Sequence, residues 1–380
     1  MQVHELALQR NKYKHLTDDE WRWLLQQVEG RERTADKLPT FAAIPDWWYP
    51  VRLSCEQCSS ELTARYKASL ANGEKMVDLT AGYGVDTYFL SERFERSDYV
   101  EQNEELCRIA THNFANKPIS IHNTTAEEFL QTAGQYDLIY LDPARRDSHG
   151  GKVFRLEDCT PNVVELLPTL LSHLTPDGRL MLKLSPMLDI TQALTTLAVS
   201  HWPLAWNVHV VAVKNEVKEV LLLGQQPTAN SQQPTITCID LAEPEKAFCF
   251  TREEERDCLL MNGDASLNGA FLYEPNAAIL KAGAYKLVAQ RFGLQKLDIN
   301  THLYASDTLV PDFPGRVWQI ANSQQPKANS QANVVCRNYP LTPEQLKKKM
   351  RLKDGGEDYL IGARVNGKPT LFWAQRVEKS

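Results

Sequence analysis

Residues 77–87 read Val-Asp-Leu-Thr-Ala-Gly-Tyr-Gly-Val-Asp-Thr, a short apolar stretch that runs into a glycine-rich turn. Gly82 and Gly84 stand where a strand has to turn sharply into a helix, and glycine lets a ligand approach the backbone there. A second predicted strand ends at Glu101, 17 residues after Gly84, a spacing that fits one β-α-β unit. A carboxylate at that strand end can accept hydrogen bonds from both ribose hydroxyls of a nucleoside. The stretch therefore predicts a nucleoside site at the strand ends of an open α/β sheet.

The turn itself discriminates between cofactors. A dinucleotide favours Gly-x-Gly-x-x-Gly, but the third position is Thr87 here, which disfavours NAD and FAD. Asp78 and Asp86 place carboxylates around the turn, which is unfavourable for phosphates and favourable for the cationic amino and sulfonium groups of S-adenosylmethionine. We therefore predict S-adenosylmethionine as the cofactor. The alternative is a Gly-x-Gly turn that is only a tight connection.

Strands and helices alternate from Lys75 onward, which predicts a parallel sheet with helical crossovers. Apolar runs predict strands near 76–80, 97–101, 119–122, 137–141, 179–184 and 206–213. A turn at 214–216 and the run 217–223 predict a hairpin that closes the sheet with an antiparallel strand. The pattern places one Rossmann-like catalytic domain at 71–225.

The residues before this domain, 1–70, are predicted to be helical. Thr17 to Glu20 offer a capping box for a helix that Gly30 would end. The segment 38–50 has three prolines and is predicted to be an ordered strap, with Trp47 and Trp48 in core packing rather than stacked on a base. One helix is expected over 54–70.

Composition indicates a multidomain globular protein: the 380 residues are 43% hydrophobic and 24% charged. No window approaches 18 consecutive apolar residues and the N-terminus is polar, so we expect neither a membrane span nor a signal peptide, and a cytoplasmic location by default. The eight cysteines are scattered, as in a reducing compartment. Cys55 and Cys58 have no second cysteine pair, so packing is expected there and no metal site.

Charge is distributed unevenly along the chain. Residues 281–380 carry 16 Lys and Arg against 8 Asp and Glu, a net charge of +8, whereas residues 1–280 carry 26 against 40, a net charge of −14. A basic module on an acidic body is typical of a protein that holds a polyanion such as RNA, although a solvated surface is the alternative. The densest run is predicted to bind nucleic acid through Lys347, Lys348, Lys349 and Arg351.

The chain resembles, over nearly its full length, a bacterial family of class I methyltransferases with a ferredoxin-like and a THUMP-like domain toward the C-terminus. The matching pieces are 56–64, 78–87, Leu-Asp-Pro-Ala-Arg-Arg at 141–146, 184–186, Tyr-Glu-Pro-Asn at 273–276 and 355–360. The resemblance implies two small α+β domains, a ferredoxin-like one at 235–283 and a THUMP-like one at 284–380, and it implies an RNA substrate. The polar repeats at 229–234 and 321–333 are expected to be flexible insertions.

Site roles follow as hypotheses. The cofactor loop would be formed by Asp78, Gly82 and Gly84, with Thr80, Ala81 and Thr87 adding contacts. Glu101 would hold the ribose, and Ala126 and Glu127 would flank the adenine. Asp142 and Pro143 follow the fourth strand, where nitrogen methyltransferases place an Asp/Asn-Pro-Pro-aromatic motif. Here Ala144 and Arg145 follow, so no aromatic residue stacks the base, which weakens an adenine-N6 assignment.

Uracil-C5 chemistry is also disfavoured, because Ser185 stands where a cysteine nucleophile would be needed. Nitrogen or ribose-oxygen methylation remains, with Asp142 as hydrogen-bond acceptor or base. Arg145 and Arg146 are predicted either to contact RNA phosphate or to form a salt-bridged loop. Two rival functions stay open: methylation of a small molecule or protein, and a noncatalytic RNA-binding protein that retains the fold. The sequence does not predict an oligomeric state.

Overall fold

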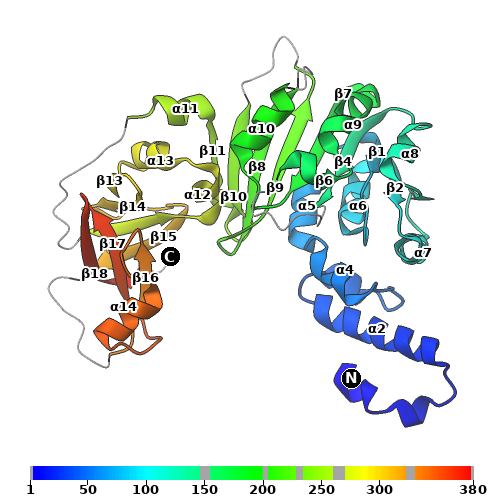
Figure 1. Ribbon diagram of the computed structural model, residues 1–380, viewed down its shortest axis with the longest axis horizontal. Helices are drawn as coiled ribbons and strands as arrows, with labels where there is room; N and C mark the ends of the chain where they lie inside the picture. The colour runs from blue at the N-terminus through cyan, green and yellow to red at the C-terminus, as the bar shows by residue number, and fades with distance from the viewer. Residues whose placement is uncertain are drawn as a thin grey trace. The chain divides into compact units, whose positions relative to one another are not determined.

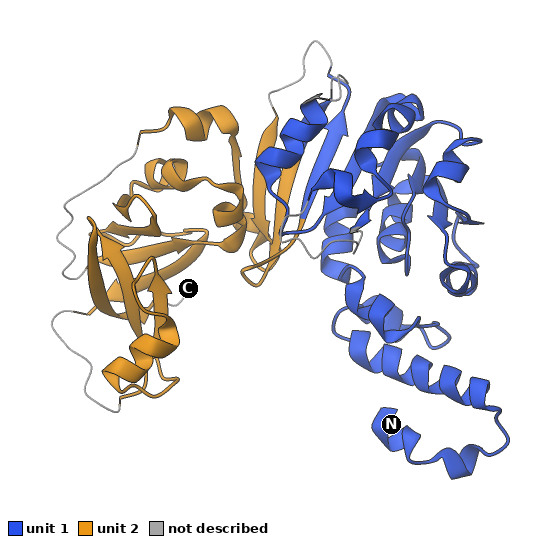
Figure 2. Ribbon diagram, in the orientation of Figure 1, with its two compact units in different colours: residues 1–207, 220–232 blue, residues 208–219, 233–380 orange. Residues whose placement is uncertain are grey.

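The computed structural model describes residues 3–145, 155–199, 204–227, 234–259, 270–321 and 330–377. The chain divides into two compact units (Figure 2), residues 1–207 with 220–232 and residues 208–219 with 233–380. Among the described residues, no helix is long and apolar enough to cross a membrane. Figure 1 labels most of the helices and strands named below.

The strands of unit 1 are neighbours in the order β9-β7-β4-β1-β2-β3, with β9 in this unit from residue 220 onward. Neighbouring strands from β7 to β3 are parallel, whereas β9 runs antiparallel to β7. The predicted parallel sheet and its antiparallel closing strand are both confirmed. The bounds are β1 (Gly73–Asp78), β2 (Phe94–Glu101), β3 (Ile119–Asn123), β4 (Tyr136–Leu141), β7 (Leu174–Leu184), β8 (Ala205–Val213) and β9 (Glu216–Gln225).

Helices alternate with these strands because their apolar side chains recur at helical spacing and polar side chains cap their first turns. Asn103, Thr125 and Asn162 each accept hydrogen bonds from backbone N–H groups at the start of a helix. The bounds are α6 (Val85–Leu90), α7 (Glu104–Asn113), α8 (Ala126–Leu130), α9 (Val163–Ser172) and α10 (Ile190–Val199). A two-stranded sheet of β5 (Ala144–Arg145) and β6 (Cys159–Thr160) follows β4.

The N-terminal residues form α1 (Val3–Ala7), α2 (Asp18–Thr34), α3 (Pro39–Ala43), α4 (Arg52–Gln57) and α5 (Glu61–Ser69). The capping box is confirmed, but Gly30 does not end α2. A Cβ at Gly30 would lie 2.3 Å from the Cβ of Tyr49, so glycine serves close packing of the strap on the helix. Trp47 is buried and stacks on Phe41, as core packing predicts.

The single helix predicted over 54–70 is broken. Residues 58–60 are not helical, and Ser60 begins α5 by accepting a hydrogen bond from the N–H of Thr63. The heptad-like apolar spacing does not reveal this break, because it is compatible with one continuous helix. The break has a consequence for the site described below, since Ser59 lies in it.

Unit 2 contains β10 (Thr235–Asp240), which pairs in parallel with residues 208–212 of β8 and antiparallel with β11 (Phe248–Thr251). A second sheet has the order β13-β14-β12-β15-β18-β17-β16. Its bounds are β12 (Phe271–Pro275), β13 (Gln295–Asp298), β14 (Thr301–Ser306), β15 (Gly315–Ile320), β16 (Asn333–Arg337), β17 (Asp358–Val365) and β18 (Lys368–Arg376). The helices are α11 (Arg252–Asp257), α12 (Ala277–Ala282), α13 (Tyr285–Phe292) and α14 (Pro343–Met350).

Candidate functional site

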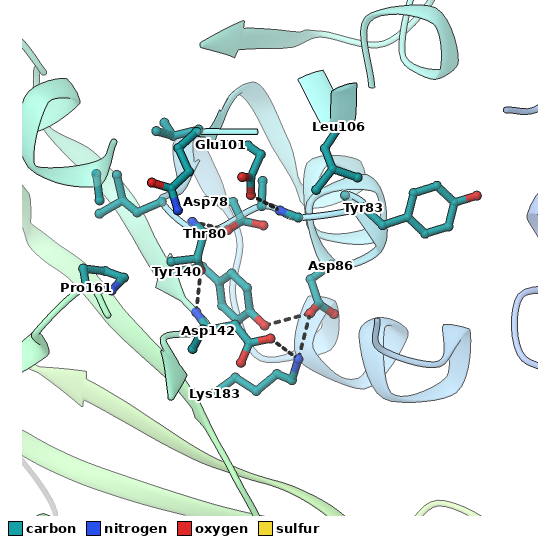
Figure 3. A pocket seen from close by; sticks show the side chains of 18 of the residues that line it. Asp78, Thr80, Tyr83, Asp86, Glu101, Leu106, Tyr140, Asp142, Pro161 and Lys183 are labelled. Carbon is teal, nitrogen blue, oxygen red and sulfur yellow. Dashed lines mark hydrogen bonds and ion pairs between the residues drawn. The ribbon is translucent and has the colours of Figure 1, made fainter. Parts of the chain in front are cut away.

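A cavity of about 460 Å³ lies in unit 1 at the carboxyl ends of β1, β2, β4 and β7. Parallel strands bring these ends to one edge of the sheet, where ligands bind in open α/β folds. In the view of Figure 3, Glu101 and Leu106 lie on one side of the cavity, and Asp142 and Lys183 lie on the opposite side. Loop residues 79–86 run between these two sides.

The turn between β1 and α6 requires glycine. Gly84 has φ +81°, and a Cβ there would lie 2.6 Å from a ring atom of Phe114. Below the turn, fully buried Asp78 accepts hydrogen bonds from the Thr80 N–H (3.1 Å) and the Thr87 hydroxyl (2.6 Å). The strand end, the turn and the helix start are therefore held as one rigid unit.

Glu101 closes the opposite side of this turn. Its carboxylate accepts hydrogen bonds from the Gly82 N–H (3.0 Å) and the Asn103 N–H (2.8 Å). A carboxylate has about four lone-pair sites, so acceptor capacity remains for ribose hydroxyls. Beyond it, residues 124–127 line the cavity, with Thr125 capping α8 and Ala126 buried.

The other side of the cavity holds an alternating chain of charges. The Lys67 ammonium lies 3.2 Å from an Asp86 carboxylate oxygen, the Lys183 ammonium lies 3.8 Å from the other, and Lys183 also donates to Asp142. Side-chain exposure rises along this chain from 0% at Lys67 through 9% and 14% to 38% at Asp142. The chain thus leads from the interior to a carboxylate at the cavity surface.

Asp86 is the centre of this chain. Its carboxylate also accepts hydrogen bonds from the Ser59 hydroxyl and the Tyr140 hydroxyl, both at 2.7 Å. Burial acts to raise the pKa of Asp86, but Lys67, Lys183 and these two hydroxyls outweigh burial, so the pKa is lowered. Asp86 is therefore ionised, and two positive and two negative side chains balance in this part of the cavity.

Asp78 behaves differently, because no cationic side chain of the described residues pairs with it. Burial raises its pKa to about 7, against the hydrogen bonds from Thr87 and Thr80, which lower it. Protonation makes the carboxyl neutral, so attraction for a cationic ligand is lost as pH falls through 7. Affinity for S-adenosylmethionine should accordingly weaken by up to about tenfold per pH unit below 7. Calorimetric titration from pH 6 to 8.5 would show this slope, and Asp78→Asn should flatten it; equal slopes in both proteins would contradict the assignment.

The structure brings most of the sequence-predicted residues together. The cavity is lined by Asp78, Thr80, Ala81, Gly82, Gly84, Glu101, Ala126, Glu127 and Asp142. Thr87 lies beneath it as the donor to Asp78, and Pro143 does not line it. Arg145 lies in β5 with its side chain outside the described residues, and Arg146 lies outside them entirely. The residues 347–351 belong to unit 2, on and after α14.

Sequence reasoning missed Lys67, Lys183, Tyr140 and Ser59 as members of the site, and it gave Asp86 only a general electrostatic role. Lys183 in an otherwise apolar strand (Leu-Met-Leu-Lys-Leu, 180–184) was the available signal. No comparable signal marks Lys67, which is fully buried although it lies in a polar helix. Across the described ranges, no group of His, Cys, Asp and Glu side chains could hold a metal ion.

The residues fit the predicted cofactor. Carboxylates of Asp78 and Glu101 lie at the loop. Among the side chains that the structure describes, Lys183 is the one cation that lines the cavity, and it is paired with acids. This donor set suits a cationic nucleoside and opposes a pyrophosphate. The loop and Glu101 would hold the amino acid and ribose parts, and residues 124–127 the adenine.

Glu101→Ala tests the ribose assignment. Charge-assisted hydrogen bonds contribute about 1.5–3 kcal/mol, so we expect S-adenosylmethionine to bind roughly tenfold to a hundredfold more weakly. Glu104→Ala is the matched control, because Glu104 is exposed and does not line the cavity. Calorimetric titration of both variants measures the effect, and unchanged affinity in Glu101→Ala would refute the assignment.

Two family models match unit 2. A ferredoxin-like domain model matches residues 271–314, and a THUMP domain-like model matches residues 321–376. The matched ferredoxin-like range begins at β12, later than the predicted start at 235. The strand β10 pairs with β8 instead, and β11 pairs with β10. The predicted domain limits stay predictions.

Whole-chain comparisons find methyltransferases. The crystal structure of a proposed methyltransferase from Porphyromonas gingivalis W83 is 34% identical, with a TM-score of 0.82, over 96% of this chain and 92% of that one. Uncharacterised S-adenosylmethionine-dependent methyltransferases from two Mycobacterium tuberculosis strains, CDC 1551 and H37Rv, are each 22% identical over 347 residues. Those matches cover 87% of this chain and 89% of each relative.

Proposed function

Because this chain belongs to the family of S-adenosylmethionine-dependent methyltransferases with ferredoxin-like and THUMP-like domains toward the C-terminus, we propose that it methylates structured RNA, rRNA or tRNA. The modified atom would be a nitrogen or a ribose oxygen. The observation that carries the RNA assignment is an exposed cationic segment inside the THUMP-like range.

This segment is α14 and the residues after it. Thr342 caps the helix, and buried Leu346 packs with Leu352 and Leu360 in a small core. Lys347 is paired with Asp354 at 2.6 Å, whereas Lys348, Lys349 and Arg351 are exposed and pair with no carboxylate of the described residues. Free cations on a firmly anchored helix are suited to phosphate contacts.

The catalytic side would be Asp142. Its backbone N–H donates to the Thr80 hydroxyl at 2.6 Å, and its carboxylate accepts from Lys183. The backbone and side chain are thus both fixed, with 38% of the side chain still exposed to the cavity. When bound, S-adenosylmethionine supplies the methyl group. Asp142 would orient the acceptor and take the proton that its N–H or O–H group loses.

Transfer of radiolabelled methyl groups to total bacterial RNA tests this proposal. We expect label that ribonuclease releases, and digestion to nucleosides would identify the modified atom. Label that resists ribonuclease, in protein or in small molecules, would contradict the proposed acceptor.

The docking role of α14 has its own test. Lys348→Glu/Lys349→Glu should weaken binding of total bacterial RNA about tenfold or more and lower its salt slope by about two, because two phosphate contacts are lost. Lys12→Glu/Lys14→Glu changes the net charge equally on exposed residues of unit 1 and should bind as the unaltered protein does. Filter binding at several salt concentrations measures both, and equal weakening in the two variants would contradict a specific role for α14.

A further inference from the structure

Part of the cavity wall comes from outside the sheet. Ser54 and Gln57 of α4, with Cys58 and Ser59 from the break before α5, line the same cavity as Asp142 and Lys183. The N-terminal helical region is therefore a component of the site as well as a neighbour of the sheet.

The backbone of this segment is firmly anchored. The Lys37 ammonium donates to the carbonyls of Cys55 (3.0 Å) and Glu56 (2.9 Å), two of the last carbonyls of α4. The N–H of Glu61 donates to the Lys37 carbonyl at 2.9 Å. The Ser59 hydroxyl donates to buried Asp86. Residues 55–61 are thus held at both ends of the break.

Gln57 is the exception within this anchored segment. It is exposed at the cavity, and its amide makes no hydrogen bond with any described residue. An amide offers two N–H donors and a carbonyl acceptor on one planar group. The amide of Gln57 is therefore available to a ligand in the cavity, and the contacts described above hold its backbone in place.

The position of Gln57 indicates which ligand its amide would bind. Ser59, two residues on, contacts Asp86, and Asp86 contacts the Lys183 that donates to Asp142. Because Gln57 precedes Ser59 by two residues in the same anchored segment, we assign it to the Asp142 side of the cavity. Figure 3 shows Glu101 across the cavity from Asp142 and Lys183.

We propose that residues 54–59 form a methyl-acceptor subsite with Asp142 and Lys183, and that Gln57 is its specificity-determining residue. The charges of this side balance in pairs, so the subsite suits a neutral group. This subsite would present the amide of Gln57, the carboxylate of Asp142 and the ammonium of Lys183. These groups match a planar edge with a donor beside an acceptor, which is the hydrogen-bonding edge of a nucleobase. The nucleobase identity rests on the proposed RNA function; the acceptor contact of Gln57 does not.

One experiment tests the nucleobase identity of the acceptor and the acceptor contact of Gln57 separately. Labelled S-adenosylmethionine is incubated with the protein and a lysate of cells that lack this gene, followed by ribonuclease digestion. Gln57→Leu removes the amide, so we expect initial labelling to fall about tenfold while affinity for S-adenosylhomocysteine is retained. Gln131→Leu is the matched control, since Gln131 is an exposed glutamine of the same unit outside the cavity lining.

Labelling by Gln57→Leu at the unaltered rate would overturn the subsite, as would a loss of S-adenosylhomocysteine affinity. Ribonuclease-resistant label would contradict the RNA acceptor alone, and the Gln57→Leu comparison would still decide the subsite. If no component of the lysate is labelled, a cysteine-protection experiment tests the subsite instead. Bound S-adenosylhomocysteine should protect the introduced cysteine of Gln102→Cys from alkylation by iodoacetamide and should leave that of Gln57→Cys reactive. Shielding of both positions would place Gln57 in the cofactor site and overturn the proposal.

Discussion

Asp86→Ala is expected to lower the free energy of unfolding by about 3–5 kcal/mol, because it leaves buried lysine charge without its partner. Lys67 is fully buried beside this carboxylate, and Lys183 is 14% exposed. The hydroxyls of Ser59 and Tyr140 would lose their acceptor as well. Denaturant unfolding followed by tryptophan fluorescence measures the change.

Asp46→Ala is the control for this experiment. Asp46 also lies in unit 1 and faces a histidine, but its side chain is 88% exposed. An exposed pair contributes about 0–1 kcal/mol, so the control should unfold almost as the unaltered protein does. Loss of less than about 1 kcal/mol in Asp86→Ala would show that the buried charges find other partners or water. Lys67→Met/Asp86→Ala should then be compared with the two single variants, because a double-mutant cycle isolates the energy of this pair.

Asp142→Asn is expected to lower kcat by about a hundredfold or more, the usual contribution of a positioned general base. Asparagine retains the shape of the side chain and the backbone hydrogen bond to Thr80, so the fold and cofactor affinity should persist. Labelled methyl transfer at saturating S-adenosylmethionine measures kcat, and calorimetry measures cofactor affinity.

Lys183 provides the companion variants. Lys183→Met removes the donor that orients the Asp142 carboxylate and should also reduce kcat, whereas Lys183→Arg keeps a cation and should retain more activity. Full activity in Asp142→Asn would refute the role of Asp142 in the reaction. A reduced S-adenosylmethionine affinity with unchanged kcat would move Asp142 to the cofactor side of the cavity.

Much of the cavity could be predicted from the sequence, because its residues lie at strand ends. Parallel topology alone brings the residues after β1, β2 and β4 to one edge, so Asp78, Glu101 and Asp142 could be expected near one another. The turn at 82–84 could also be predicted from the sequence, since Gly82 and Gly84 have the positive φ values that glycine adopts readily. The hairpin turn at Asn366-Gly367 between β17 and β18 follows the same rule, since both residues have positive φ.

Gly30 and the α4–α5 break show where local patterns are insufficient. Glycine near a helix end predicts a stop, yet Gly30 lies within α2 because the strap at Tyr49 packs against it. Likewise, apolar spacing is compatible with one helix over 54–70, while Ser59 turns toward Asp86, a partner 27 residues away. Contacts between distant segments decide both outcomes, and these contacts have no local signature.

The sequence by itself determined the strand–turn–helix unit, the parallel sheet around it, the cofactor class and the basic C-terminal part, because each depends on local residue type and spacing. Only the tertiary structure decided the chain from Lys67 through Asp86 and Lys183 to Asp142. Charges are stable in an interior only when partners arrive at the right distances from separate elements, here α5, α6, β7 and the end of β4. The spacing of residues along one segment does not predict that side chains from separate elements come together. The same packing of separate elements brings Gln57 to the cavity.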